Sequence, residues 1–314
     1  MAFVVGANLP WVRYGGDFGA NAWAPAGGVA ARDASALESA FARLAAGGVT
    51  HLRWFLLCDG RAGLQLDEER RPRGLDEAVW RDIDAALTLT ARARLRLMPV
   101  LFDFHLCRPR RYVNRVQIGG RAHLLSVRDH RERLLDTVVA PILERYGREP
   151  VIATWDLINE PEWAIFGVGT WNPVCSVSRG AMRAYIRSAA ALVHTQTCHQ
   201  VTVGSASTAT LPLVQGLGLD SFHPHWYDPV ELRAPLDRHT TQLGCDGPVI
   251  LGEFPSRGSA RRVDELLTTA RRQGYAGAYA WSVLADDSAS DRVSLEAGIR
   301  HWINARNDED GRRA

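Results

Sequence analysis

The stretch from Trp155 to Pro161 is WDLINEP, and the stretch from Val249 to Phe254 is VILGEF. Each is an apolar run that leads directly into a glutamate, Glu160 in the first and Glu253 in the second. Such a run is typical of a buried strand in a parallel barrel, whose C-terminal end lies at the barrel mouth. The two stretches therefore predict a barrel that carries two carboxylates at its mouth.

Short apolar runs alternate with longer amphipathic stretches along the rest of the chain. Eight runs are predicted strands, at 3–9, 50–57, 94–104, 151–158, 200–204, 220–223, 249–252 and 277–283. The amphipathic stretches predict helices at 34–46, 75–93, 128–146, 179–197 and 259–273. This alternation favours an α/β fold, a single (β/α)8 TIM barrel, over a doubly wound sheet. No glycine-rich phosphate fingerprint follows the first predicted strand, which also counts against the doubly wound alternative.

The length and composition of the chain allow one large core or two modest ones, and its charge favours few kinds of partner. The chain has 314 residues, of which 46% are hydrophobic, and a formal net charge of +2. We therefore expect a catalytic barrel over residues 1–306, a charged and disordered tail over 307–314, and no nucleic-acid or membrane partner. Every basic residue is arginine, so mechanisms that need a lysine Schiff base or a lysine general base are excluded.

The cysteines and the N-terminus indicate in which cellular compartment the protein works and whether it holds a structural zinc ion. The five cysteines are scattered and lack paired spacing, which argues against a disulfide framework and a structural zinc site. The first residues show no basic region followed by an apolar segment, so no signal peptide is visible. We expect a cytoplasmic protein, unless a leader was removed before the numbering begins.

Two carboxylates at one barrel mouth are what retaining hydrolysis of a glycosidic bond requires. One carboxyl group must be protonated beside the leaving oxygen, and the other must be ionised below the anomeric carbon. In such enzymes the two groups lie roughly 5 Å apart. A lone Asn-Glu-Pro motif is weak evidence, since a glutamate there could cap a helix. The prediction depends on several such residues falling at strand ends in the right order.

The chain resembles the retaining glycoside hydrolases of clan A, and most of all glycoside hydrolase family 5. The resemblance extends from the second predicted strand to the eighth. It identifies Glu160, in Asn159-Glu160-Pro161, as the acid/base and Glu253 as the nucleophile. It also implies substrate-site roles for Arg53 in His51-Leu52-Arg53-Trp54, His105 in Asp103-Phe104-His105, His225-Trp226-Tyr227 and Trp281.

Each of these residues has a physical task in that chemistry. Arg53 and a tyrosine hydroxyl are expected to keep Glu253 ionised, with a pKa below its ordinary value. Burial and the charge on Glu253 are expected to raise the pKa of Glu160, so that it stays protonated. Asn159 could donate to the sugar 2-hydroxyl, and Trp281 offers a flat apolar face to a pyranose ring.

Three connections that follow strands, 10–28, 106–126 and 161–178, are longer than a barrel needs. Long loops in a compact domain are more often functional than idle. We expect some of their aromatic residues to form sugar-stacking walls and the others to pack the loops onto the barrel: Trp11, Tyr14, Phe18, Trp23, Trp163, Phe166 and Trp171. The second loop is rich in arginine, which could bind an anionic group or a neighbouring subunit, although a solvated face is the simpler interpretation.

The sequence therefore predicts a retaining hydrolase of β-linked hexosides, with a carbohydrate substrate and no cofactor or metal. Glucosides and mannosides both fit the resemblance, and short oligosaccharides or glycoconjugates are the expected substrates. Two alternatives remain. One is a sugar-binding barrel without activity. The other is a metal-dependent hydrolase or isomerase, whose ligands would have to come from Asp103, His105, His223 and His225.

Overall fold

The computed structural model of the chain describes residues 3–228, 236–285 and 287–311. Eight strands form one parallel sheet, in the spatial order β10-β9-β8-β5-β2-β1-β12-β11. Their bounds are Val4–Asn8 (β1), His51–Phe55 (β2), Arg96–Asp103 (β5), Thr154–Asn159 (β8), Gln200–Ser205 (β9), His223–Pro224 (β10), Ile250–Pro255 (β11) and Gly277–Trp281 (β12). Parallel bridges from Phe222 to Val249 and from His225 to Glu253 join β10 to β11. The sheet thus closes on itself, and the predicted (β/α)8 barrel is confirmed.

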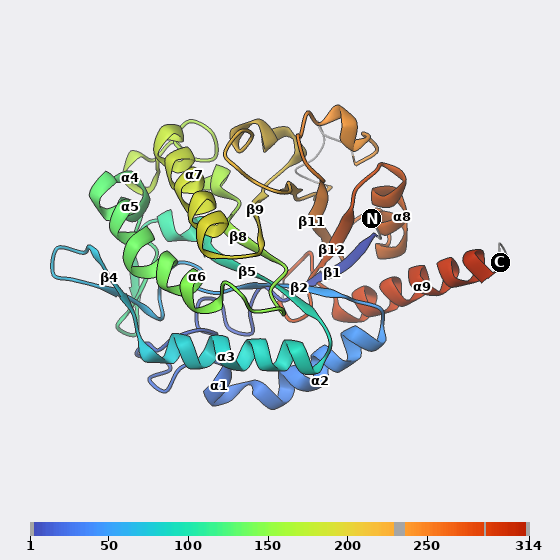
Figure 1. Cartoon of the computed structure of the whole chain (residues 1–314), viewed down its shortest axis with the longest axis horizontal. Helices are drawn as coiled ribbons and strands as arrows, with labels where there is room; N and C mark the ends of the chain where they lie inside the picture. Colours follow the sequence, from blue (N-terminus) through green and yellow to red (C-terminus); the bar gives the residue numbers. More distant parts are fainter. Residues whose placement is uncertain (1–2, 229–235, 286, 312–314) are drawn as a thin grey trace.

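Helices lie around the outside of the strands (Figure 1). They are Val29–Arg32 (α1), Ala34–Ala46 (α2), Glu77–Arg92 (α3), His123–Ser126 (α4), Arg128–Leu134 (α5), Ala140–Tyr146 (α6), Arg179–Gln196 (α7), Val263–Arg272 (α8) and Arg292–Gly311 (α9). The side chain of Ser178 accepts a hydrogen bond from Ala181 N and so caps α7. None of the described helices is both long and apolar enough to cross a membrane.

Two predictions about helices need correction. The predicted helix at 128–146 is interrupted by a π-helical turn at Leu135–Val139, which separates α5 from α6. The helix α9 was not predicted, and it continues to Gly311. Residues 307–311 of the expected disordered tail are therefore helical, while 312–314 lie outside the described residues.

The long loops follow the C-terminal ends of strands and form small structures of their own. After β2, the hairpin of β3 (Leu64–Leu66) and β4 (Pro72–Leu75) leads to α3. After β5, a 3-10 turn at Phe104–Cys107 leads to the hairpin of β6 (Arg111–Val113) and β7 (Val116–Ile118). After β8, 3-10 turns form at Pro161–Ala164 and Pro173–Cys175.

The buried carboxylate of Asp17 fixes the loop 10–28 onto the barrel. Asp17 accepts hydrogen bonds from Val12 N and Arg13 N, both at 2.7 Å, and from Trp54 Nε1 at 2.9 Å. Trp54 lies in β2 and is completely buried. The start of the loop is therefore held against a core strand, and this contact positions Trp11 at the barrel mouth.

Candidate active site

The two predicted catalytic glutamates lie at the mouth of the barrel. Glu160 directly follows β8 in a left-handed backbone conformation with φ of 45°, and its N–H donates to Gly204 O at 2.7 Å. Glu253 lies in β11. One oxygen of each carboxyl group and a ring nitrogen of His225 all lie within 4.8 Å of one another. This proximity of two oxygens fits the retaining arrangement, with carboxyl groups about 5–5.5 Å apart, better than the inverting one at about 6.5–9.5 Å.

Glu253 is held by two donors. Arg53 Nη1 donates to its Oε1 at 2.5 Å, and the hydroxyl of Tyr227 donates to its Oε2 at 2.7 Å. Burial nevertheless raises the pKa of Glu253, and the positive charge of Arg53 opposes that rise. The pKa below the ordinary value that we expected is therefore wrong in direction, because loss of hydration outweighs the ion pair.

Arg53 is fully buried and contacts several polar groups of the barrel interior. Its Nε and Nη2 donate to Asp156 Oδ2 at 3.0 and 2.8 Å, and Nη2 also donates to Asn159 Oδ1 at 2.7 Å. Its Nη1 donates to Asn8 Oδ1 at 3.1 Å. A buried guanidinium is tolerated only when it is paired and hydrogen-bonded in this way. Arg53 thus fixes the position of Glu253 and Asn159 from below.

Glu160 is in surroundings that favour its protonated form. Burial and the charge of Asp103 raise its pKa to about 7. The direction agrees with our prediction, although the neighbouring charge is that of Asp103 rather than Glu253. Trp163 Nε1 donates to Glu160 Oε2 at 3.0 Å, and His225 Nδ1 lies 2.8 Å from Oε1. Burial lowers the pKa of His225 to about 4, so its ring is neutral at pH 7.

A cleft of about 320 Å³ lies above these carboxylates. Among its lining residues are Trp11, Phe55, Asp103, Phe104, His105, Asn159, Glu160, Trp163, Ala206, Tyr227, Glu253, Trp281 and Asp287. The carboxylate of Asp103 accepts from His105 N at 2.7 Å and lies 2.6 Å from Nδ1 of the same residue, which fixes the imidazole ring. Trp281 Nε1 donates to Asp287 Oδ2 at 2.9 Å, which fixes the indole ring.

Most of the predicted site residues meet at this cleft, but three do not line it. Arg53 and His225 are completely buried and contact the two glutamates rather than the cleft. Trp226 packs in the main hydrophobic core and is only 6% exposed, so its predicted contact with substrate is wrong. Asp156 and Asn8 were missed, although an acid within an otherwise apolar barrel strand signals a buried cation nearby.

Some of the aromatic residues of the long loops take one of the two expected roles, and others take neither. Trp11 and Trp163 line the cleft. Phe18 is buried edge-on against Trp54 and packs its loop onto the barrel. Phe166 and Trp171 contact each other edge-on, with centroids 5.9 Å apart, and remain exposed.

In the described structure, Asp103, His105, His223 and His225, the ligands expected for a metal-dependent enzyme, do not meet in one group. Within the described ranges, the one group of three side chains close enough to share an ion is Glu160, His225 and Glu253. The imidazole of His223 instead lies 3.0 Å from the hydroxyl of Ser221. The set that a metal-dependent barrel would need is therefore not assembled.

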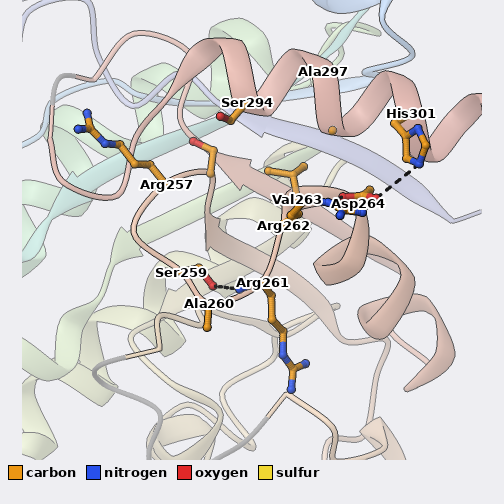
Figure 2. A pocket seen from close by; sticks show the side chains of 12 residues that line it. Arg257, Ser259, Ala260, Arg261, Arg262, Val263, Asp264, Ser294, Ala297 and His301 are labelled. Carbon is orange, nitrogen blue, oxygen red and sulfur yellow. Dashed lines mark hydrogen bonds and ion pairs between the residues drawn. The ribbon is translucent and has the colours of Figure 1, made fainter.

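A separate cavity of about 600 Å³ lies beside α8 and α9 (Figure 2). Two of its ionic groups pair with Asp264: Arg262 Nη2 lies 2.8 Å from Asp264 Oδ2, and His301 Nε2 lies 3.7 Å from the same atom. Arg257 and Arg261 also line the cavity. Asp264 is the one carboxylate among the described residues that line it. This cavity cannot perform chemistry that needs two carboxylates.

Known proteins resemble the chain over nearly its whole length. A mannan endo-1,4-β-mannosidase of Mytilus edulis is 24% identical over 320 residues, which cover 89% of this chain and 83% of that protein. The crystal structure of an endo-1,4-β-mannanase from Eisenia fetida matches with a TM-score of 0.80 at 20% identity, covering 96% of this chain and 90% of that one. No family model matches the chain.

The chain resembles the retaining glycoside hydrolases of family 5. A β-1,4-D-mannanase of Cryptopygus antarcticus has the same fold, with a TM-score of 0.79 at 20% identity and coverage of 95% of this chain and 89% of that one. Because the structural matches have low identity, they establish the barrel alone. The sequence match to the Mytilus edulis protein covers 89% of this chain, so the similarity to that mannosidase extends over nearly the whole barrel.

Proposed function

We propose that this protein is a retaining endo-β-1,4-mannanase. The observation that carries the proposal is the pair of carboxyl groups, Glu160 and Glu253, with oxygens within 4.8 Å at one barrel mouth. The choice of mannose comes from the activity named for the similar proteins. Cleavage within a chain is supported by a second cavity of about 610 Å³ that adjoins the cleft and leaves room for further sugars.

In the first step the carboxylate of Glu253 attacks the anomeric carbon and forms a glycosyl ester. The bond to the leaving oxygen breaks, and Glu160 supplies the proton that this oxygen needs. In the second step Glu160, now ionised, takes a proton from water, and the water oxygen displaces Glu253. Each step inverts the anomeric carbon, so the product keeps the β configuration.

The surrounding residues prepare both carboxyl groups for these steps. Arg53 and Tyr227 occupy both oxygens of Glu253, which orients the nucleophile before the sugar binds. Arg53 donates to the side-chain oxygen of Asn159, and the side-chain nitrogen of Asn159 donates to Asp103 Oδ2 at 3.3 Å. The second N–H of this nitrogen can donate to the 2-hydroxyl of a sugar in the cleft that Asn159 lines. The indole of Trp281 supplies the apolar floor for the ring.

The test is a set of parallel assays on β-1,4-mannan, cellulose, and manno- and gluco-oligosaccharides of increasing length. We expect cleavage of mannan within the chain, with the β anomer appearing first in the NMR spectrum of the fresh product. Longer mannans and short mannooligosaccharides are both included, because the sequence predicts short substrates. Initial release of the α anomer, or a preference for glucans, would overturn the proposal, and complete inactivity would favour the non-catalytic alternative.

A further inference from the structure

A second cavity of about 610 Å³ continues the catalytic cleft on one side. Trp11 and His105 line both the cleft and this cavity, so the two spaces adjoin. Its other lining residues are Tyr14, Arg61, Arg108, Pro109, Arg111 and Ile118. A sugar chain that leaves the cleft on this side would therefore enter a space that contains three arginines.

The charge in this cavity is not balanced. The segment 104–122, which forms one wall, contains five arginines and no acidic residue. The guanidinium of Arg61 is paired with Asp59 through contacts of 2.8 and 2.9 Å. By contrast, no carboxylate in the described part of the chain forms a salt bridge with Arg108 or Arg111. Two guanidinium groups therefore face the cavity without a counter-charge.

The rest of the lining suits the body of a sugar ring. Trp11 and Tyr14 pack edge-on, with centroids 4.9 Å apart, and Arg61 stacks over the ring of Tyr14 at 4.6 Å. These contacts fix the two aromatic side chains in place. The guanidinium of Arg108 stacks over the ring of Phe104 at 5.1 Å. This contact limits the conformations that the guanidinium group can adopt before any ligand binds.

We propose that this cavity is a subsite for an acidic sugar of the substrate chain, whose anionic group pairs with Arg108 and Arg111. The inference rests on the proposed mannanase function and adds a preference for chains that carry acid groups. Arginine forks bind carboxylates and phosphates with parallel hydrogen bonds, whereas a neutral hydroxyl accepts at most a weaker contact. The cavity of Figure 2 is also lined by arginines, but it shares no lining residue with the catalytic cleft, so it does not continue the path of the substrate chain.

The experiment compares three substrates with the same backbone. One is neutral β-1,4-mannan, the second is the same mannan sparsely oxidised at C6 to carboxylates, and the third carries sparse phosphate esters. The measured quantity is kcat/KM on each acidic substrate divided by kcat/KM on the neutral one. We expect this ratio to exceed one for the carboxylate, the phosphate or both. It should fall toward one as salt is raised, since partly exposed charges are screened over about 8–10 Å at ordinary ionic strength.

The double variant Arg108→Gln/Arg111→Gln removes the two unpaired charges and keeps polar side chains of moderate length. We expect its ratio to fall roughly three- to tenfold, the effect of losing two exposed charge pairs. The matched control is Arg115→Gln, which changes an exposed arginine of the same loop that does not line the cavity. The control should keep the wild-type ratio.

Two results would overturn the subsite. One is a wild-type ratio at or below one on both acidic substrates while neutral mannan is cleaved well. The other is an equal fall of the ratio in the control and in the double variant, which would indicate the net charge of the surface rather than this cavity. Failure to cleave any of the mannans is a different outcome, because it removes the mannanase function on which the inference rests.

Discussion

The guanidinium of Arg53 and the carboxylate of Glu253 form a buried ion pair, with Nη1 2.5 Å from Oε1. Arg53 is completely buried and does not line the cleft, so it acts on the sugar through the residues that it holds, Glu253 and Asn159. Removing one partner of a buried pair leaves an uncompensated charge, at a cost of about 3–5 kcal/mol. The pair therefore serves both the stability of the barrel and the ionisation of Glu253.

Replacing Arg53 with methionine should move the acid limb of the pH profile upward. Activity requires ionised Glu253 and is lost as the pH falls through its pKa, which burial raises and Arg53 lowers. Without Arg53 that pKa rises further, by roughly one to two pH units if one charge-assisted contact of about 1.5–3 kcal/mol is lost. The measurement is kcat/KM against pH on a mannooligosaccharide.

Because Arg53→Met also leaves Asp156 without its partner, Tyr227→Phe provides a gentler second variant. It removes the 2.7 Å hydrogen bond to Glu253 Oε2 without changing a charge, and it should shift the same limb upward by less. If neither folded variant shifts the acid limb, Glu253 does not set it.

Replacing Trp163 with phenylalanine should move the alkaline limb upward. Activity requires protonated Glu160 and is lost as the pH rises through its pKa of about 7. The hydrogen bond from Trp163 Nε1 stabilises the charged form and lowers this pKa, so its loss should raise the alkaline limb by up to about one pH unit. The acid limb should stay in place. A downward shift of the alkaline limb would contradict the geometry at Glu160.

The two catalytic glutamates should differ in how their alanine variants respond to the leaving group. Glu160→Ala should still cleave substrates with a good leaving group, because such a group needs no proton in the first step. Glu253→Ala should be inactive on all substrates and be rescued by azide, which gives an α-configured glycosyl azide from a β-mannoside. Equal losses for both variants across leaving groups, without azide rescue, would reverse or remove these assignments.

The sequence predicted which residues meet at the ends of the strands, but it did not predict how burial changes their pKa values. Glu160, His105 and Trp281 follow or end apolar strands, and Glu253 lies near the end of one. Because parallel strand ends must meet at one mouth, the meeting of these residues could be foreseen. The raised pKa of Glu253 could not, because the sequence shows its charged neighbours but not how far water is excluded.

Trp226 shows an error that the sequence could have prevented. Side chains alternate along extended chain, so His225 and Tyr227 share the face that is turned toward the two glutamates and Trp226 has the opposite one. The π-helical turn at Leu135–Val139 could not have been predicted in this way, because the same amphipathic pattern fits an uninterrupted helix. The arrangement of the long loops also depends on distant partners, as with Asp17 and Trp54.

Replacing Glu162 with glutamine should stabilise the protein at alkaline pH. Glu162 is 2% exposed, and burial raises its pKa to about 7, while its Oε2 accepts from Ala206 N at 3.1 Å and its Oε1 has no hydrogen-bond partner. A carboxyl group with a raised pKa binds its proton more tightly in the folded state. Its contribution to stability is thus complete below the unfolded pKa of about 4.5 and is lost as the pH rises through 7.

Glutamine keeps an acceptor for Ala206 N and carries no charge at any pH, so it avoids this loss. The free energy of unfolding of Glu162→Gln should match the wild type within about 1 kcal/mol at pH 4. At pH 8 it should exceed the wild type by an amount on the order of 2–3 kcal/mol. Denaturant unfolding at both pH values measures the difference, and Glu144→Gln, at an exposed position of α6, is the matched control. A gain that is equal at pH 4 and pH 8 would show that the amide improves packing, and that the charge on Glu162 costs the fold nothing.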